Sequence, residues 1–383
     1  MLQSRKEFLK TMAAGAFSAT ACLPHVWGQS PSTAAGGVPS YLKGREEAYA
    51  RDPRAAAIAW HRAANWGLFV HYALHSLRGL TAQDAMQAQR RSSAEWKKLK
   101  QGDLAEYARL KDRFTAEKFD ADFITDLALA AEMRYVNFTT RHLGELYMFR
   151  TSVSDFTSLN SPARRDLVEE LANQCRKKGL GLFLYCPPDV ARTEPQETFD
   201  RNRTNIRELL TQYGPIAGIW LDGIGSYYQE PEAYARLDEL YALVRELQPQ
   251  CLISFKQGTG TEDFVAPEGL MHAKKDTIAQ EAWRRNRGKR GDICANMQTT
   301  PPAWLYLEGC QHVDADQTLA LLADAFAQEA NLTLNTGPLG DGSIHPDDVA
   351  ALRAAGERIR QHGFPPPRRM DPAERKKLKM RSA

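Results

Sequence analysis

Short apolar runs alternate with longer amphipathic segments along most of the chain, from Trp60 onward. The apolar runs predict buried β-strands at 67–72, 135–140, 180–185, 218–221, 251–255 and 331–334. In the intervening segments, apolar residues recur at helical spacing and predict helices at 122–132, 163–178, 199–213, 231–247, 316–330 and 346–361. Strands that are repeatedly followed by helices indicate a parallel sheet covered by helices.

The predicted fold class is therefore α/β, a (β/α)8-type, TIM-like barrel that is either regular or slightly irregular. Gly179 and the pair Gly214-Pro215 stand where predicted helices must end before the next strand begins. The polar, charged segment 80–112 predicts an elaborated loop with helical turns on one face of the barrel. A doubly wound open sheet is the alternative, but no glycine-rich dinucleotide fingerprint follows the first predicted strand.

The two ends of the chain differ in composition from the predicted barrel, which we place at residues 40–363. Residues 1–30 have a charged front and a short alanine-rich stretch, and they resemble a twin-arginine export signal with Lys6 at the second arginine position. The stretch is too short to span a bilayer, so we expect an exported protein, periplasmic or extracellular, without an integral membrane segment in its mature form. Residues 364–383 are basic with little apolar patterning, which predicts a solvated, mobile tail.

Composition limits the partners that we expect. The 383 residues carry a net charge of +3 on a mixed acidic and basic surface, which gives no reason to expect nucleic acid as a partner. Cysteines outside the signal segment are odd in number and lack zinc-type spacing. We therefore predict buried free thiols and no metal site.

Polar or aromatic residues end most of the predicted strands. They are His71, then Arg141 and His142, then Tyr185, then Trp220 and Asp222, then Lys256. In a parallel barrel, the carboxyl ends of the strands meet on one face, where active sites lie. A single histidine at a strand end is more often a structural hydrogen-bonding group, but the repeated pattern predicts one shared pocket.

The segment that ends at Asp222 is the most informative of these strand ends. Its apolar residues suit a strand that is covered on both faces, and Gly223 permits a sharp turn just after the carboxylate. Asp222 is therefore a candidate catalytic residue. It could equally cap the helix that is predicted from residue 231 onward, and this segment alone does not decide between the two roles.

Aromatic residues and carboxylates together favour carbohydrate chemistry. Flat apolar faces for a sugar ring are offered by Trp66, Tyr72, Trp96, Tyr185, Trp220 and Trp304, although core packing is the commoner role of such residues. Retaining glycoside hydrolysis needs a nucleophilic carboxylate and a protonated acid about 5 to 5.5 Å apart. Asp222 suits the nucleophile, and the candidates for the acid are Glu262, Glu268 and Asp292.

With these residues identified, the chain resembles the α-L-fucosidases of glycoside hydrolase family 29 from about residue 60 to residue 363. The motifs that carry the resemblance are Gly67-Leu68-Phe69-Val70-His71-Tyr72, Glu95-Trp96, Thr139-Thr140-Arg141-His142, Leu184-Tyr185-Cys186-Pro187-Pro188-Asp189, 218–223, Glu262-Asp263-Phe264 with Pro267-Glu268, and 331–338 with Asp341-Gly342. The resemblance implies a catalytic barrel, a fucose-containing oligosaccharide or glycan as substrate, and no cofactor. The C-terminal β-sandwich of that family is expected to be absent.

The resemblance also implies roles for individual residues. Asp222 aligns with the family's nucleophile, and Glu268 falls on the acid/base of one branch, with Lys256 where that branch has an arginine. Glu262 and Asp292 stay as alternative acids. Positions that line the sugar pocket match His71, Glu95, Trp96, His142, Tyr185 and Trp220, and we add Tyr72, Arg141 and Lys256 from the ends of the predicted strands.

The chain departs from the family's pattern at two places near the expected pocket. Leu143 stands where a second pocket histidine is typical, and Tyr72-Ala73-Leu74 replaces a Trp-Gly-Pro turn. A leucine cannot make the same contacts with sugar hydroxyls, so the specificity for fucose is open to change. We hold two hypotheses: an exported retaining exo-glycosidase that hydrolyses α-L-fucosides or a closely related sugar by double displacement, and a catalytically inactive carbohydrate-binding protein on the same scaffold.

Overall fold

The computed structural model describes residues 37–92, 94–95, 98–99, 102–142, 146–187, 196–223, 233–256, 258–268, 281 and 284–378. The predicted export signal, Trp96 and Leu143 lie outside these residues. Among the described residues, none of the helices combines the length and the apolar character that crossing a membrane requires.

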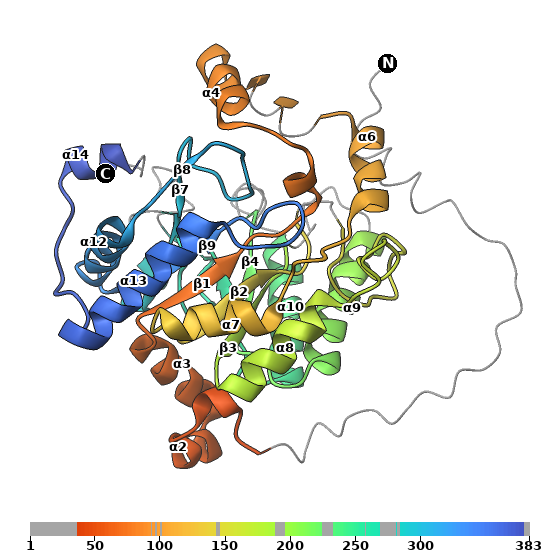
Figure 1. The fold of residues 1–383 in the computed structure, drawn as a ribbon. Coiled ribbons are helices and arrows are strands. Elements are labelled where there is room, and N and C mark those ends of the chain that lie inside the picture. Colours follow the sequence, from red (N-terminus) through yellow and green to blue (C-terminus); the bar gives the residue numbers. More distant parts are fainter. Residues whose placement is uncertain are drawn as a thin grey trace, which may run out of the picture.

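Seven parallel strands form the central sheet, in the order β5-β4-β3-β2-β1-β9-β6 (Figure 1). They are β1 (Trp66–Val70), β2 (Tyr135–Thr139), β3 (Gly181–Tyr185), β4 (Gly218–Leu221), β5 (Leu252–Phe255), β6 (Gly291–Asn296) and β9 (Ala330–Thr336). All six strands predicted from apolar runs are confirmed. We did not predict β6, because Asp292 and Asn296 interrupt its apolar pattern.

Segment 264–268 lies between the two edge strands of this sheet and links them. An isolated parallel bridge joins Phe264 to β5, and two more join Val265 and Glu268 to β6. The backbone N–H of Cys294 in β6 donates to the carbonyl of Pro267 at 3.0 Å. The predicted (β/α)8-type fold class is therefore confirmed, with a short, irregular strand in the eighth place.

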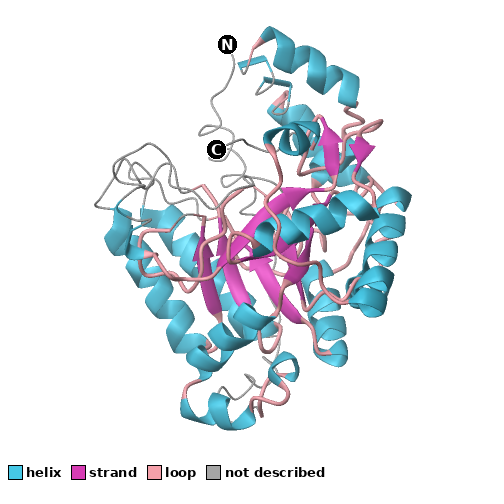
Figure 2. Ribbon diagram, turned by 90° about the vertical axis from the view of Figure 1, so that its left-hand side faces the viewer, coloured by secondary structure: helices cyan, strands magenta, loops and turns pink. Residues whose placement is uncertain are grey.

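Helices cover the outside of the barrel, as the strand–helix alternation predicts (Figure 2). The helices of the described residues are α2 (Glu46–Arg51), α3 (Pro53–Ala63), α4 (Ala82–Arg91), α6 (Leu104–Arg109), α7 (Ala121–Ala130), α8 (Leu167–Lys178), α9 (Gln196–Gln212), α10 (Ala233–Leu247), α12 (Ala315–Phe326), α13 (Pro346–His362) and α14 (Pro372–Lys377). Helices α8, α7, α13 and α12 pack side by side in that order (Figure 1). Gly179 ends α8 at a φ of 72°, where a side chain would be strained. The charged segment 80–112 forms the expected helical turns, α4 and α6.

The core has two layers because successive strand residues point to opposite faces of the sheet. On β4, Ile219 and Leu221 pack outward with the helices, and Trp220 packs inside the barrel. Trp60 of α3 stacks on Phe183 inside the barrel, with ring centroids 6.2 Å apart. Each large apolar side chain that is fully buried in this way stabilises the fold by about 1.5–3 kcal/mol.

We predicted a solvated, mobile tail at 364–383, but its described part, up to residue 378, packs in part against α12. Arg375 is buried and pairs with the buried carboxylate of Asp324 in α12. The backbone N–H of Met370 donates to the same carboxylate at 2.9 Å, and Leu378 is buried. The basic pattern of the tail does not reveal this packing, because the carboxylate that receives Arg375 lies 51 residues earlier in the chain.

Two smaller features complete the described fold. The strands β7 (Gln298–Thr300) and β8 (Gln311–His312) form an antiparallel pair, and the loop between them carries Trp304. The five described cysteines are free thiols, and four of them are buried, as predicted.

Candidate active site

The site centres on Lys256, which follows β5 and lies between two carboxylates. Its Nζ atom is 3.3 Å from Oδ1 of Asp222, after β4, and 2.7 Å from Oε1 of Glu268, at the end of the irregular strand. The carboxylates are 46 residues apart in sequence, and the strand order of the barrel brings them to one ammonium group. Lys256 itself has a φ of 50°, in the left-handed region that few residues with side chains adopt.

Asp222 is held as a carboxylate. Burial raises the pKa of this group, but the positive charge of Lys256 and two hydrogen bonds more than offset that effect and lower the pKa. The backbone N–H of Gly223 donates to Oδ1 at 2.7 Å, and the hydroxyl of Tyr185 donates to Oδ2 at 2.9 Å. These two donors bind both oxygens of Asp222, while residues 224–232, where a helix capped by Asp222 would begin, lie outside the described residues.

Lys256 is held as a cation. Burial lowers the pKa of its ammonium group, but Asp222 and Glu268 reverse that effect, and the pKa is raised overall. The ammonium also lies over two indole rings, 4.7 Å from the centroid of Trp220 and 5.8 Å from that of Trp304. Cation–π attraction at such distances adds to the electrostatic stabilisation of the charge.

Five rings lie close together at this site, from the ends of β1, β2, β3 and β4 and from the loop between β7 and β8. Tyr185 stacks between Trp220 and His142, with centroid distances of 5.5 and 5.8 Å. The ring of His71 lies 5.5 Å from Tyr185 and 5.2 Å from Trp304. The structure thus brings together five of the residues that the sequence singled out, as a wall suited to the apolar and polar faces of a sugar.

The tautomer of His71 follows from its neighbour Asn335. The amide nitrogen of Asn335 donates to Asn296 and to the carbonyl of Trp304, so its oxygen must accept the 2.6 Å hydrogen bond from Nδ1 of His71. Burial, together with the charge of His142, lowers the pKa of His71 well below its ordinary value. The ring is therefore neutral, and its Nε2 is a hydrogen-bond acceptor.

Two of the predicted pocket residues, Tyr72 and Arg141, make contacts outside this group of rings, and a third, Glu95, is exposed. Tyr72 points out of the barrel, where its ring stacks on Phe119 and its hydroxyl donates to the carbonyl of Gly340 at 2.9 Å. Arg141 is buried, and its guanidinium donates to the carbonyl of Pro187 at 2.9 Å. Glu95 is exposed beyond α4.

The two alternative acids, Glu262 and Asp292, have their own hydrogen-bond partners and are not paired with Lys256 among the described contacts. Glu262 is fully buried and organises its own loop, accepting hydrogen bonds from the backbone N–H groups of Thr259 and Gly260 and from the hydroxyl of Tyr241. Asp292 lies near the amino end of β6. It accepts hydrogen bonds from Tyr135 at 2.9 Å and Thr333 at 2.5 Å, and His61 lies 3.4 Å away.

Two residues that lie in the site were not among the pocket residues that we predicted from the sequence. Asn335 orients His71, and its signal was its place directly after the predicted strand 331–334. Trp304 was noted only as one aromatic residue among six. No local pattern marks it, because it reaches the site from the loop between β7 and β8.

These observations define a class of protein first. A carboxylate pair that shares one lysine, within a wall of aromatic and imidazole rings at the carboxyl end of a (β/α)8-type barrel, has the layout of a barrel glycoside hydrolase. The family described as alpha-L-fucosidase matches residues 45–364, and the chain belongs to this family.

Individual relatives are distant. The chain is 24% identical to alpha-L-fucosidase 1 of Arabidopsis thaliana over 243 residues, which are 57% of this chain and 47% of the relative. It is 29% identical to the putative alpha-L-fucosidase 1 of Oryza sativa subsp. japonica over 273 residues, 66% of this chain and 52% of the relative. The chain thus spans about half the length of these plant proteins.

Solved structures support the same fold. The alpha-L-fucosidase isoenzyme 1 from Paenibacillus thiaminolyticus superimposes with a TM-score of 0.65 at 23% identity, covering 81% of this chain and 77% of that structure. An alpha-L-fucosidase from Lactobacillus casei, solved with its alpha-L-fucose product, superimposes with a TM-score of 0.62 at 24% identity. The match covers 80% of this chain and 98% of that structure.

Proposed function

We propose that the protein is an exported retaining α-L-fucosidase that acts on fucose-containing oligosaccharides or glycans. The observation that carries the mechanism is the position of Asp222 and Glu268 on one lysine nitrogen. Their two contacting oxygens cannot be farther apart than the sum of 3.3 and 2.7 Å, about 6 Å. Retaining enzymes hold their carboxyl groups about 5–5.5 Å apart and inverting enzymes about 6.5–9.5 Å, so this spacing favours retention.

In the first step, the carboxylate of Asp222 attacks the anomeric carbon of the sugar. The bond between that carbon and the glycosidic oxygen breaks, and Glu268 gives its proton to the departing oxygen. An ester between the sugar and Asp222 forms, a free alcohol leaves, and Glu268 becomes a carboxylate. The hydrogen bonds from Gly223 and Tyr185 hold Asp222 in one orientation for this attack.

In the second step, Glu268 takes a proton from water while the water oxygen attacks the anomeric carbon. The ester bond breaks, Asp222 leaves as a carboxylate, and the sugar is released with its original anomeric configuration. Lys256 supports both steps. In the free enzyme Lys256 contacts both Asp222 and Glu268, and in the ester, where Asp222 is neutral, its charge stabilises Glu268 as the ionised base.

The sugar itself is proposed from the family and from the names of its relatives. Residues 45–364 match the fucosidase family, and the relatives described above are named as fucosidases. The wall of rings suits a hexose, because Nε2 of His71 can accept a hydrogen bond from a hydroxyl and Trp304, which is partly exposed, can face the C–H groups of the ring.

Hydrolysis is tested with purified protein and an aryl α-L-fucoside, with the aryl α-L-galactoside as the related sugar. We expect Asp222→Gly to lose roughly 10³-fold or more in kcat, since the residue that forms the covalent bond is gone. Azide should restore turnover and give a glycosyl azide of inverted configuration. Asp155→Ala, which removes an exposed loop carboxylate, is the matched control and should keep full activity.

The same assay separates the two hypotheses that the sequence left open. If Asp222→Gly turned over substrate at the wild-type rate, Asp222 would not be the nucleophile. Saturable binding of fucose in calorimetry, with no hydrolysis across a panel of aryl glycosides, would favour the catalytically inactive carbohydrate-binding protein.

Export is proposed from the composition of residues 1–30, a charged front followed by an alanine-rich apolar stretch. We expect the mature protein outside the cytoplasm to lack about the first 30 residues, since export signals are cleaved. Cell fractionation followed by intact-mass measurement tests this. A cytoplasmic protein that keeps Met1 would contradict it.

A further inference from the structure

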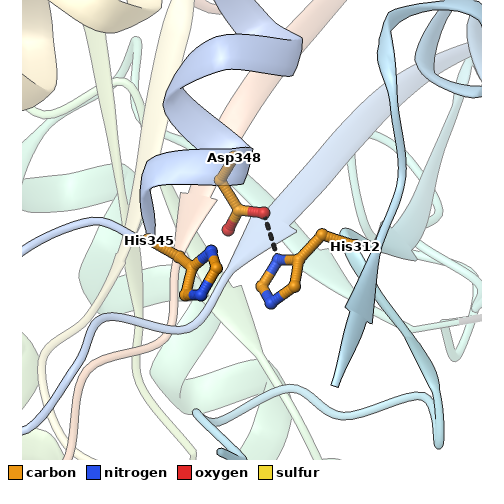
Figure 3. Close-up of side chains that lie close together, drawn as sticks. All are labelled: His312, His345 and Asp348. Carbon is orange, nitrogen blue, oxygen red and sulfur yellow. Dashed lines mark hydrogen bonds and ion pairs between the residues drawn. The ribbon is translucent and has the colours of Figure 1, made fainter. Parts of the chain in front are cut away.

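A cluster of two imidazoles and a carboxylate lies outside the site described above. His312 comes from β8, His345 precedes the first residue of α13, and Asp348 lies in the first turn of that helix (Figure 3). One nitrogen of each histidine and one oxygen of Asp348 all lie within 4.8 Å of one another. These side chains converge from segments that are 33 residues apart in sequence.

The carboxylate of Asp348 is fixed before any ligand binds. It is fully buried, and its Oδ2 accepts a 2.6 Å hydrogen bond from the hydroxyl of Thr336. Its Oδ1 lies 2.5 Å from Nδ1 of His312, so the carboxylate and the imidazole already face each other. A zinc ion would take the place of the proton that these two atoms share.

The donor set suits zinc more than calcium or magnesium, which prefer oxygen ligands. Tetrahedral zinc at about 2.0–2.1 Å from its ligands requires ligand atoms about 3.3 Å apart. His312 and Asp348, now 2.5 Å apart, must separate slightly, and any pair near the 4.8 Å limit must close by about 1.5 Å. The rings of His312 and His345 are stacked 4.0 Å apart and must open for a metal to enter. His345 is the ring that can rotate, because its side chain is 24% exposed and its hydrogen bond from the backbone of Asp347 is long, at 3.3 Å.

A recess beside His312 gives access to the cluster. It is lined by Thr299, Cys310, Gln311, His312, Asp314, Gln317 and Asp347. Cys310 and Asp314 in this lining offer further sulfur and oxygen ligands.

We propose that His312, His345 and Asp348 bind one zinc ion. The metal would tie the β7–β8 pair to α13 and, through Thr336, to the end of β9. The loop between β7 and β8 carries Trp304, whose carbonyl already accepts a 2.8 Å hydrogen bond from Asn335 of β9. Zinc therefore stabilises the placement of this loop against the barrel. The sequence predicted no metal site, because the two histidines and the aspartate do not have zinc-motif spacing.

The binding test uses the full chain, freed of metal with a chelator and titrated with zinc chloride in a calorimeter. We expect one zinc per chain in the wild type. His345→Asn removes one imidazole but keeps a residue that caps helices well, so its fold should persist while its zinc affinity falls at least about 100-fold. His312→Asn should do the same. His362→Asn, at the exposed far end of α13, is the matched control and should bind zinc like the wild type.

Two further readouts separate this cluster from adventitious binding. Zinc should raise the Tm of the wild type and of His362→Asn but not that of His345→Asn, and it should slow hydrogen exchange of amides in residues 298–312. The proposal is overturned by a folded wild type that takes up no zinc at millimolar concentration, or by equal affinity in His345→Asn, His312→Asn and the wild type. Unchanged exchange in residues 298–312 despite zinc binding would overturn the role in placing the loop.

Discussion

The substitution Tyr185→Phe removes one hydroxyl and leaves the ring of Tyr185 where it is. The ring is buried and stacked between Trp220 and His142, so phenylalanine keeps the packing. What is lost is the 2.9 Å hydrogen bond to Oδ2 of Asp222. This hydrogen bond stabilises Asp222 when it is charged, which is before the first step of the proposed reaction and after the second.

The magnitude follows from the chemistry of that hydrogen bond. A hydrogen bond to a charged group contributes about 1.5–3 kcal/mol. The side chain of Asp222 is 24% exposed, so water replaces part of the lost interaction, and we take the lower end. Since 1.36 kcal/mol is a factor of ten in rate, the release of Asp222 from the sugar ester should slow by about tenfold.

The sign of the effect differs between the two steps. Without the hydrogen bond from Tyr185, the carboxylate of Asp222 is less stable. It should therefore attack at least as fast in the first step, but it is a poorer leaving group in the second step. The ester intermediate should therefore accumulate. With 4-nitrophenyl α-L-fucoside, stopped-flow measurement should show a burst of about one nitrophenol per chain, and kcat and KM should fall together by about tenfold while kcat/KM changes little.

The outcome that refutes this reasoning is a fall in kcat/KM with KM unchanged and no burst. That result would mean that the hydroxyl acts in the first step, on the attack itself. Wild-type kinetics in a mutant of normal circular dichroism would mean that the hydrogen bond between Tyr185 and Asp222 has no catalytic role.

Three further substitutions test the site and the fold. Lys256→Met removes the cation that lowers the pKa of Asp222, so the acid limb of the pH profile of kcat/KM should move to higher pH. Gly356→Ala places a Cβ 1.9 Å from a backbone oxygen at the end of α7, which should destabilise the fold by about 1–3 kcal/mol, measured as a lower Tm in thermal unfolding. Arg375→Met leaves the buried carboxylate of Asp324 without its ion pair and should destabilise the fold by about 3 kcal/mol in urea unfolding.

Each of these substitutions has a control on the same chain. Lys43→Met, at an exposed lysine near the start of the described residues, should leave the acid limb where it is. Arg353→Ala, an exposed position on α13, should leave the Tm within about 1 °C of the wild type, and Arg369→Met should leave the urea midpoint unchanged. An acid limb that does not move in Lys256→Met would contradict the effect of Lys256 on the pKa of Asp222. Unchanged stability would contradict the close approach of Gly356 to α7 in Gly356→Ala, and the ion pair with Asp324 in Arg375→Met.

Strands and helices could be predicted because their signals are local. The run 135–140 is apolar over its own length, and Gly179 stops a helix at its own position, so neither needs knowledge of the fold. The irregular strand 264–268, which closes the barrel, could not be predicted from such a local signal. It is short and contains Pro267, which counts against a strand, and it is held by neighbours on both sides.

The candidate site shows the same division between local and non-local information. The sequence predicts the strand ends that carry His71 and Asp222. We did not apply the alternation of side chains along each strand, which determines whether a residue points into or out of the barrel. Alternation along a strand places Phe69 and His71 inside the barrel, and it therefore places Tyr72 outside, as the structure shows. The sequence offered Trp304 as one of six aromatic residues, but its place in the site could not be predicted, since its loop is held by a hydrogen bond from Asn335, 31 residues away.

The irregular strand also explains why Glu268, among the three candidate acids, shares a lysine with Asp222. The backbone N–H of Ala266 donates to the carbonyl of Lys256 at 2.8 Å, so the strand that carries Glu268 is hydrogen-bonded directly to the residue that supplies the cation. Its other edge is held by β6. Glu262, on the preceding loop, has its oxygens bound by that loop's own N–H groups. Strand pairing, and not loop conformation, therefore sets the distance between Asp222 and Glu268, the two carboxylates that we propose act in hydrolysis.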